Sequence, residues 1–271
     1  MKLSISGRLF EVDYTYCELP IEEFVDLAKK IGYQGVELRK TQVSLETPAQ
    51  DVAKIRQIVE RAGLEVTCIT TRGISLKDRE SFELFQRYVS LAEALGCKLI
   101  KTGGDIPWVQ RAADYAAEHG IVLAGNNHIG TPFETVSSTL KYLRRVDRKN
   151  YRLIYDPANL FVAQEEYGPE TIRKFADYIC YVTVQCPKRV SLEQGDHLFQ
   201  YKGFTYRQGL PGEQAVPDFA SVFQGLHQIG YNGWVSVIRP RSNDTESRDL
   251  ARLFYQRLTQ MIEDGRRYAN R

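Results

Sequence analysis

The stretch Gly120-Ile-Val-Leu-Ala-Gly-Asn-Asn-His-Ile-Gly-Thr131 decides how the chain is interpreted. Its apolar part predicts a short strand, and the strand leads directly into three hydrogen-bonding side chains, Asn126, Asn127 and His128. This order is typical of a parallel strand in an α/β protein whose carboxyl end forms part of a site. The stretch therefore predicts a parallel sheet, and it indicates the edge of that sheet at which function is expected.

The same unit recurs on both sides of this stretch. Segments of helical periodicity, several of them ended by glycine, alternate with short apolar segments that predict strands. Besides the opening stretch, the predicted strands are 2–6, 35–39, 64–71, 98–102, 151–156, 178–184 and 234–238. The predicted helices are 20–31, 48–62, 78–95, 112–118, 134–145, 169–176, 217–229 and 245–268.

This alternation predicts one closed (β/α)₈ barrel that occupies residues 1–271 as a single domain. The 271 residues match the ~250 that such a barrel typically needs. An open doubly wound sheet is the alternative. It is disfavoured because no G-x-G-x-x-G motif follows the first strand.

Charge and hydropathy exclude several functional classes. A net charge of +2 provides no bulk field for nucleic acid or for an acidic membrane surface. No run approaches the ~18 apolar residues of a membrane span, and residues 1–8 become polar too early for a signal peptide. We therefore expect a cytoplasmic protein that binds neither nucleic acid nor membrane.

The segment 186–216 is much longer than the usual connection between a strand and a helix in this fold. The segment shows no clean periodicity, whereas such connections typically have ~4–6 residues. It is a candidate lid over the barrel mouth, because long ordered loops are often functional. An oligomer contact is the alternative. We predict an uncovered aromatic patch of Phe199, Tyr201, Phe204 and Tyr206, which would suit either a homodimer or a lid.

The carboxyl ends of barrel strands converge on one site, and many cations are expected there. Arginine and lysine gathered at one edge predict a local site for a small anion, because guanidinium groups bind phosphate or carboxylate through paired hydrogen bonds. The predicted substrate-binding residues are Arg39, Arg72, Asn126, Asn127, Asn159, Thr183, Gln185, Lys188 and Arg239.

The candidate catalytic residues are Asp156, His128, Lys101 and Glu37. Asp156 ends an apolar strand before Pro157, which suits a metal or a substrate hydroxyl, although an Asx turn or a helix cap fits the same pattern. Glu37 alternates with its apolar neighbours, which favours a place inside the barrel. His128 fits a structural hydrogen bond as well as a catalytic role.

At this point the chain resembles the xylose isomerase-like TIM-barrel superfamily of sugar isomerases, epimerases, inosose dehydratase and an apurinic endonuclease. The resemblance covers nearly the whole chain in the right order. It rests on the segments Ile31-Gly-Tyr-Gln-Gly-Val-Glu-Leu38, Ala62-Gly-Leu-Glu-Val66, Ala94-Leu-Gly-Cys-Lys98, Ala117-Glu-His-Gly-Ile-Val-Leu123, Asn126-Asn-His-Ile-Gly-Thr131, Tyr155-Asp-Pro-Ala-Asn159, Gly209-Leu-Pro-Gly-Glu213, Val216-Pro-Asp218 and Gly230-Tyr-Asn-Gly-Trp-Val-Ser236.

The resemblance implies a divalent metal held by Glu, Asp, His and Glu at the ends of strands five to eight. Those four positions are Asn126, Asp156, Thr183 and Ile238, so Asp156 is the only retained family ligand. We therefore predict no metal ligand set and no cofactor, with weak Mg²⁺ held mainly by the substrate as an alternative. Asn159 stands where the endonuclease would have a histidine, which disfavours DNA repair.

Two functions of different classes follow. The first is an isomerase, an epimerase or a lyase that acts on a small anionic sugar or polyol derivative, in which a positively charged pocket replaces the metal. The second is a non-catalytic sugar-binding or accessory protein on the same barrel. It is favoured by the absence of a new acid/base pair that would compensate for Asn126 and Ile238, which cannot accept a proton near neutral pH.

Overall fold

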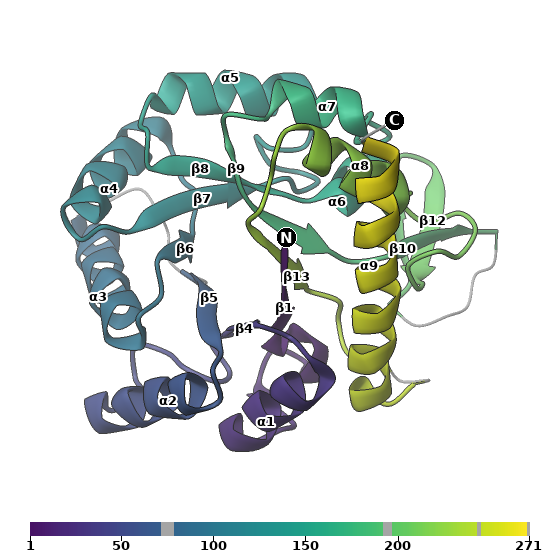
Figure 1. Ribbon diagram of the computed structural model, residues 1–271. Helices are drawn as coiled ribbons and strands as arrows, with labels where there is room; N and C mark the ends of the chain where they lie inside the picture. The colour runs from purple at the N-terminus through teal and green to yellow at the C-terminus, as the bar shows by residue number, and fades with distance from the viewer. Residues whose placement is uncertain (72–78, 192–196, 243–244, 270–271) are drawn as a thin grey trace.

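The computed structural model describes residues 1–71, 79–191, 197–242 and 245–269, and within them eight parallel strands close into a barrel. The strand order is β1-β13-β9-β8-β7-β6-β5-β4, and helices surround the barrel (Figure 1). The barrel strands are β1 (Lys2–Ser6), β4 (Gly35–Glu37), β5 (Glu65–Thr70), β6 (Leu99–Lys101), β7 (Val122–Asn126), β8 (Tyr151–Tyr155), β9 (Ile179–Val184) and β13 (Trp234–Val237). The predicted single-domain (β/α)₈ barrel is confirmed.

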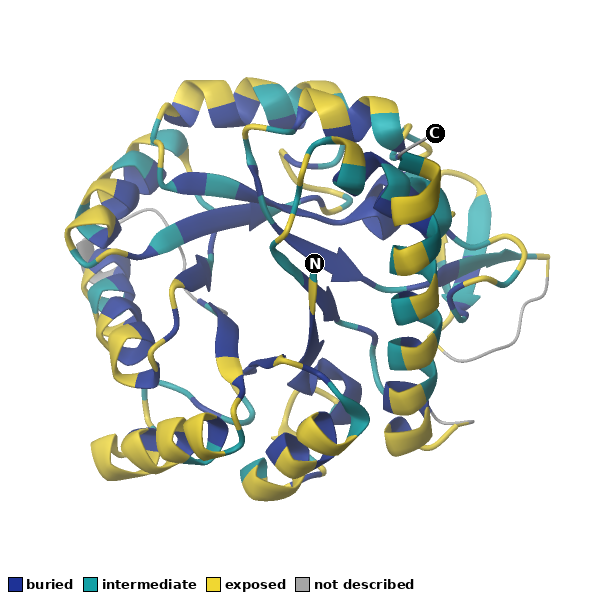
Figure 2. Ribbon diagram, viewed as in Figure 1, coloured by how far each residue is buried: buried dark blue, intermediate teal, exposed yellow. Residues whose placement is uncertain are grey.

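The helices cover the outside of the barrel with their buried faces turned inward (Figure 2). They are α1 (Ile21–Ile31), α2 (Ala49–Arg61), α3 (Arg79–Leu95), α4 (Ile106–Glu118), α5 (Val136–Val146), α6 (Pro157–Val162), α7 (Pro169–Lys174), α8 (Phe219–Gln228) and α9 (Ser247–Ala269). In the described part of the chain, no helix is long and apolar enough to cross a membrane.

Alternation along the strands separates two apolar layers. Most buried residues fill the space between strands and helices. A smaller cluster lies inside the barrel and consists of Cys68, Leu99, Ala124, Ile154 and Tyr181. Because side chains alternate along a strand, residues two positions beyond this inner cluster project into the barrel mouth. These include Thr70, Lys101, Asn126, Asp156 and Thr183.

Two helix starts differ from the sequence prediction by more than two residues, and each has a capping residue as its cause. Helix α4 begins at Ile106, well before the predicted 112, because the Asp105 side chain accepts a hydrogen bond from the Trp108 N–H. Helix α6 was not predicted at all. It begins directly after Asp156, whose carboxylate accepts from the Asn159 N–H at 3.0 Å.

Residues 186–216 contain secondary structure of their own. β10 (Pro187–Val190), β12 (Phe204–Gln208) and β11 (Phe199–Tyr201) form an antiparallel sheet beside α6, and a short ribbon of β2 (Glu11–Val12) and β3 (Tyr16–Cys17) follows the 3₁₀ turn η1 (Gly7–Phe10). The Tyr206 ring is buried and stacks on Phe199 with the centroids 5.3 Å apart. Phe204 and Tyr201 are half-buried. The prediction of an uncovered aromatic patch is therefore wrong, because these rings pack against their own sheet and α6.

Candidate active site

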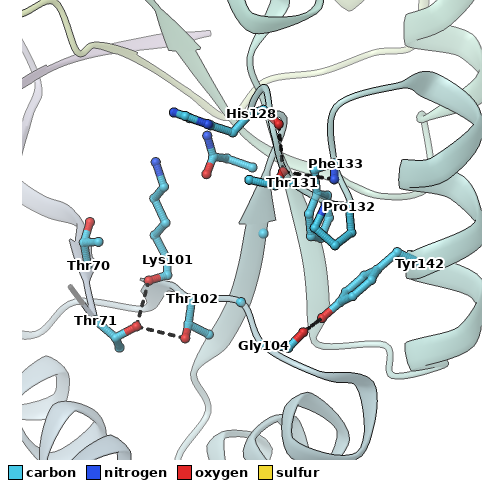
Figure 3. Close-up of a pocket in the computed structure, with 13 residues that line it drawn as sticks. Thr70, Thr71, Lys101, Thr102, Gly104, His128, Thr131, Pro132, Phe133 and Tyr142 are labelled. Atoms are coloured by element: carbon cyan, nitrogen blue, oxygen red, sulfur yellow. Dashed lines mark hydrogen bonds between the residues drawn. The ribbon is translucent and has the colours of Figure 1, made fainter. Parts of the chain in front are cut away.

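A cavity of about 450 Å³ opens at the carboxyl ends of β5, β6 and β7. Its polar lining combines one lysine, one histidine, one asparagine and several threonines, and no carboxylate lines it among the described residues. Figure 3 shows this lining. The residues are Thr70, Thr71, Lys101, Thr102, Gly103, Gly104, Gly125, Asn126, His128, Thr131, Pro132, Phe133 and Tyr142. We call this side of the barrel mouth the open half.

Lys101 provides the positive charge of the open half. It ends β6 two residues after Leu99, which belongs to the inner apolar cluster, so its side chain faces the barrel interior. In Figure 3 the side chain extends toward the end of the cavity at which His128 lies. Its Nζ makes no hydrogen bond or ion pair with any described residue. Burial lowers the pKa of the Lys101 ammonium, and the negative charges of Glu37 and Asp156 offset this only in part.

His128 and Asn126 form the rim above Lys101. The Nδ1 of His128 lies 2.9 Å from the Ile129 carbonyl oxygen. A carbonyl can only accept, so the neutral ring carries its proton on Nδ1 and leaves Nε2 able to accept one. The Asn126 Nδ2 donates to the Asn127 carbonyl at 2.9 Å. His128 thus offers the Nε2 of its neutral ring to the cavity as a proton acceptor.

The remaining walls are hydroxylic on one side and apolar on the other. Thr71 Oγ1 donates to Thr102 Oγ1 at 2.9 Å, whereas Thr70 Oγ1 is buried without a hydrogen-bond partner among the described residues. Opposite them, the rings of Phe133 and Tyr142 pack with centroids 4.7 Å apart. Gly125 permits this packing, because a Cβ there would lie 2.3 Å from the Phe133 ring.

A clasp outside the cavity fixes the loop that carries His128. The Lys202 ammonium, in the turn between β11 and β12, lies 2.9 Å from Glu134 Oε1 and donates to the Ala163 carbonyl at 3.0 Å. The other carboxylate oxygen of Glu134 accepts from the Gly130 N–H at 2.9 Å. These contacts, led by the Lys202 hydrogen bond, lower the pKa of Glu134 to about 2. The sheet of residues 186–216 therefore braces the rim of the open half.

Glu37 ends β4, the strand next to β5, and is 1% exposed. Its carboxylate accepts hydrogen bonds from Ser6 Oγ at 3.0 Å and Ser236 Oγ at 3.2 Å. The Tyr181 hydroxyl also donates to it at 3.4 Å, and Arg39 Nη1 lies 3.8 Å away. These contacts engage both oxygens of the Glu37 carboxylate, so its role in the barrel interior is structural: it links β4 to β1, β9 and β13.

Other cations of the mouth are also paired with carboxylates. Arg39 Nε lies 3.6 Å from Glu11 Oε2, and Arg8 Nη1 lies 3.4 Å from the same oxygen. Lys188 pairs with Glu213 at 3.1 Å. The expected surplus of positive charge is therefore largely neutralised within the protein. We call the strand ends of β1, β4, β8 and β9, with these ion pairs, the paired half.

Arg239 does not line this cavity. Arg239 is buried and lines a separate cavity of about 240 Å³ with Gln208 and Glu213. Arg72 lies outside the described residues. Of the predicted substrate-binding residues, Asn126 lines the open half.

Asp156 belongs to the paired half and is 2% exposed. Besides capping α6 through one oxygen, it accepts a hydrogen bond from Gln185 Nε2 at 2.9 Å through the other. Asn127 supports it from behind: its Oδ1 accepts the Asp156 N–H at 3.4 Å, and its Nδ2 donates to Phe133 and Thr139. Asn159 Nδ2 and Thr183 Oγ1 are buried and have no hydrogen-bond partner among the described residues.

The residues at the four family metal positions do not fit a divalent cation. Asp156 is the sole carboxylate among Asn126, Asp156, Thr183 and Ile238, and both of its oxygens already accept N–H donors. The described ranges contain no group of three or more His, Cys, Asp or Glu side chains that could hold a metal. The Lys101 ammonium is close enough to interact with Asp156 and would repel a second cation.

Sequence reasoning missed Thr70, Phe133 and Tyr142 as lining residues. Thr70 carried a signal, since it alternates with Cys68 on β5 and is the register partner of Lys101. Phe133 and Tyr142 carried none, because they lie beyond the strand end in a loop and in α5, where alternation does not apply.

Comparison with known proteins places this geometry in context. Residues 25–257 match the family described as xylose isomerase-like TIM barrel. Inosose dehydratase of Geobacillus thermodenitrificans is 24% identical over 73% of this chain, and the match spans 64% of that enzyme's length. A probable ketose 3-epimerase of Synechocystis is 23% identical over 86% of this chain and 83% of its own. The solved structure of the probable 3-DHS dehydratase AsbF from Bacillus anthracis superposes with a TM-score of 0.75 at 16% identity, covering 96% of this chain and 99% of that one.

Proposed function

The chain belongs to the xylose isomerase-like TIM-barrel family, and from this premise we propose that it is an isomerase, epimerase or lyase of a small sugar or polyol derivative. The reaction would move a proton on a carbon beside a carbonyl group, without a resident divalent metal. The relatives named inosose dehydratase and probable ketose 3-epimerase support this class of chemistry.

One observation carries the proposal: Lys101 places a cation, unpaired within the described structure, inside a cavity of about 450 Å³, which has room for a monosaccharide. Removing a proton beside a carbonyl puts negative charge on the carbonyl oxygen. A preorganised cation in a partly desolvated site stabilises that negative charge. A divalent metal provides the same electrostatic stabilisation in metal-dependent reactions of this type. A single such cation suits one carbonyl or carboxylate oxygen.

His128 completes the arrangement as the group that carries the proton. Its Nε2 can accept a proton in the neutral ring, and it lines the same cavity as Lys101. Thr70 and Asn126 would hold substrate hydroxyls, since a buried hydroxyl without a partner gains most from one. Glu37 and Asp156 would act on Lys101 through their charge and on the fold through their hydrogen bonds.

Solvent deuterium exchange tests this proposal even when the product of the reaction is unidentified. The protein is incubated in D₂O with a panel of ketoses, ketose phosphates, inososes and hydroxyketo acids, and loss of the signal of the hydrogen beside the carbonyl is followed by proton NMR. We expect catalysed exchange with at least one compound. Absence of exchange across the panel, at protein concentrations that saturate binding, would contradict the proposal.

A second candidate function is sugar binding without catalysis. It is favoured by the engagement of both mouth carboxylates, Glu37 and Asp156, in internal hydrogen bonds. Isothermal titration with the same panel separates the two functions, because a binding protein would show heat of binding with compounds that undergo no exchange.

A further inference from the structure

We propose that Lys101 acts as a nucleophile that forms an imine with the carbonyl group of an aldehyde or ketone substrate. This inference rests on the proposed function and deepens it, since it states how Lys101 supplies positive charge to the reacting carbon. The protonated imine would be the electron sink of the reaction.

Lys101 lies where a nucleophile is needed, and its amine takes no part in interactions that stabilise the fold. Its Nζ faces the cavity and makes no hydrogen bond or ion pair with any described residue. Lysines at structural positions of the mouth behave differently: Lys188 pairs with Glu213, and Lys202 pairs with Glu134. Leaving a half-buried ammonium unpaired costs stability, which is a common mark of a functional group.

The two carboxylates near Lys101 are occupied by other donors. Glu37 is already engaged by Ser6, Ser236 and Tyr181, and Asp156 by Asn159 and Gln185. Neither forms a direct ion pair that would lock the ammonium in its charged form. Below Lys101 lies the apolar cluster that includes Leu99 and Ala124, which disfavours the charged form by desolvation.

A buried hydroxyl lies beside the lysine. Thr70 is paired in register with Lys101 across β5 and β6, and its Oγ1 has no hydrogen-bond partner among the described residues. Figure 3 shows Thr70 flanking Lys101 at the wall of the cavity. An unpartnered hydroxyl at this position is suited to the oxygen that a carbonyl carbon carries after attack by the amine.

Cysteine does not compete for this role. Cys68 lies in the inner cluster, where burial raises the pKa of its thiol well above the ordinary value. Cys186 is equally buried, and burial raises its pKa as well. A neutral buried thiol is a poor nucleophile, so the lysine is the nucleophile that this end of the barrel offers.

The chemical step balances with substrate, protein and water alone. The uncharged amine of Lys101 attacks the carbonyl carbon, and a C–N bond forms as the C=O π bond gives a hydroxyl group hydrogen-bonded to Thr70. The two amine hydrogens then leave with the carbonyl oxygen as water, and a C=N bond remains. A proton from water then adds to the imine nitrogen. The protonated imine accepts the electron pair of the neighbouring C–H bond while His128 takes the proton, which gives an enamine. His128 returns this proton, or one exchanged with solvent, to carbon, and addition of water to the regenerated protonated imine releases the carbonyl product, the free amine and a proton.

Borohydride trapping tests the imine directly. The full-length protein is incubated separately with dihydroxyacetone, ribulose and scyllo-inosose, reduced with sodium borohydride, and analysed by intact mass and peptide mapping. We expect an adduct with the mass of the ketone less one oxygen atom, located on Lys101. Because the wild-type protein reports the site itself, the result does not depend on a variant that folds.

Two variants sharpen the assignment. Lys101→Arg keeps the positive charge without a nucleophilic amine, and we expect complete loss of the adduct. Lys98→Arg is the matched control, because Lys98 is exposed and precedes the same strand, and it should keep the adduct. Circular dichroism and thermal unfolding verify that both variants are folded.

The outcomes separate this inference from the proposed function. No adduct on Lys101 with any ketone, or equal labelling of Lys98 and Lys101, would overturn the imine. If deuterium exchange then persists in Lys101→Arg, the isomerase function stands with Lys101 as a replaceable charge. If the Lys101 adduct forms but no compound undergoes exchange, the imine site stands and the isomerase function fails.

Discussion

The open half and the paired half of the barrel mouth are built from similar residue types, and they differ in what surrounds each charge. In the paired half, Arg8 and Arg39 share the carboxylate of Glu11, and Glu37 is surrounded by hydroxyl donors. In the open half, Lys101 faces a cavity that no described carboxylate lines. A count of charges at one sheet edge therefore says little about ligand binding, because only a charge without an internal partner is available to a ligand.

The largest expected effect concerns the unpaired lysine. Lys101→Met should lower catalysed deuterium exchange by about 10²–10⁴-fold, the range associated with loss of one acid/base or electrophilic group. The exchange rate measured by NMR at saturating substrate checks this. Lys98→Met, which removes an exposed lysine before the same strand, should leave the rate unchanged. Equal deuterium-exchange rates in wild type and Lys101→Met would show that the unpaired lysine of the open half has no catalytic role.

The second effect tests whether the paired half carries stability. Glu37→Gln should lower the free energy of unfolding by about 3 kcal/mol, because it breaks a buried ion pair and leaves Arg39 and several hydroxyl donors poorly satisfied. Urea unfolding followed by fluorescence gives the value. Glu65→Gln is the control, since Glu65 pairs with Lys2 in an exposed contact and should matter little. A Glu37→Gln variant as stable as wild type would refute the anchoring role.

The third effect concerns the apolar wall of the open half. Gly125→Ala should cost about 1–3 kcal/mol, because its Cβ would meet the Phe133 ring at 2.3 Å and force the wall to move. Ligand affinity should fall with it, as measured by isothermal titration. Gly103→Ala offers a matched comparison, since Gly103 lines the same cavity and its Cβ would meet nothing within 4 Å. Similar losses in both variants would show that the wall is not set by this contact.

The smallest effect tests the clasp that braces the open half. A carboxyl whose folded pKa is lowered contributes stability above its ordinary pKa and loses it as pH falls through the folded value. Since the pKa of Glu134 is lowered from 4.5 to about 2, this contribution should disappear as pH falls from 4.5 toward 2. Glu134→Gln should flatten that part of the stability profile slightly, because the pair is partly exposed. If the free energy of unfolding depends on pH in the same way in wild type and Glu134→Gln, the ion pair between Glu134 and Lys202 does not contribute to stability.

The sequence predicted the fold better than the site, and particular residues show why. Strand alternation and helix periodicity are local signals, and the positions of β1, β5 and β9 follow from them almost to the residue. The placement of Lys101 inside the barrel is also a local consequence of alternation. The pairing of Arg39 with Glu11 is not, because it depends on a short ribbon after β1 that brings a carboxylate from another loop.

Asp156 illustrates the same limit from the other side. The sequence left a metal ligand and a helix cap as alternatives, and the structure shows the cap in place. The second oxygen accepts a hydrogen bond from Gln185, which donates from the end of a neighbouring strand. Such a partner is fixed by the packing of β8 beside β9, and no spacing in the sequence encodes it.

Closure of the barrel has a consequence for biosynthesis. β1 lies between β4 and β13, and Lys2 to Ile5 pair in register with Trp234 to Val237. During translation the earliest strand must therefore wait for a segment more than two hundred residues later before its second edge is satisfied. Until then the nascent sheet exposes two strand edges, so we expect assistance from a holding chaperone to improve the yield of this chain in cell-free synthesis.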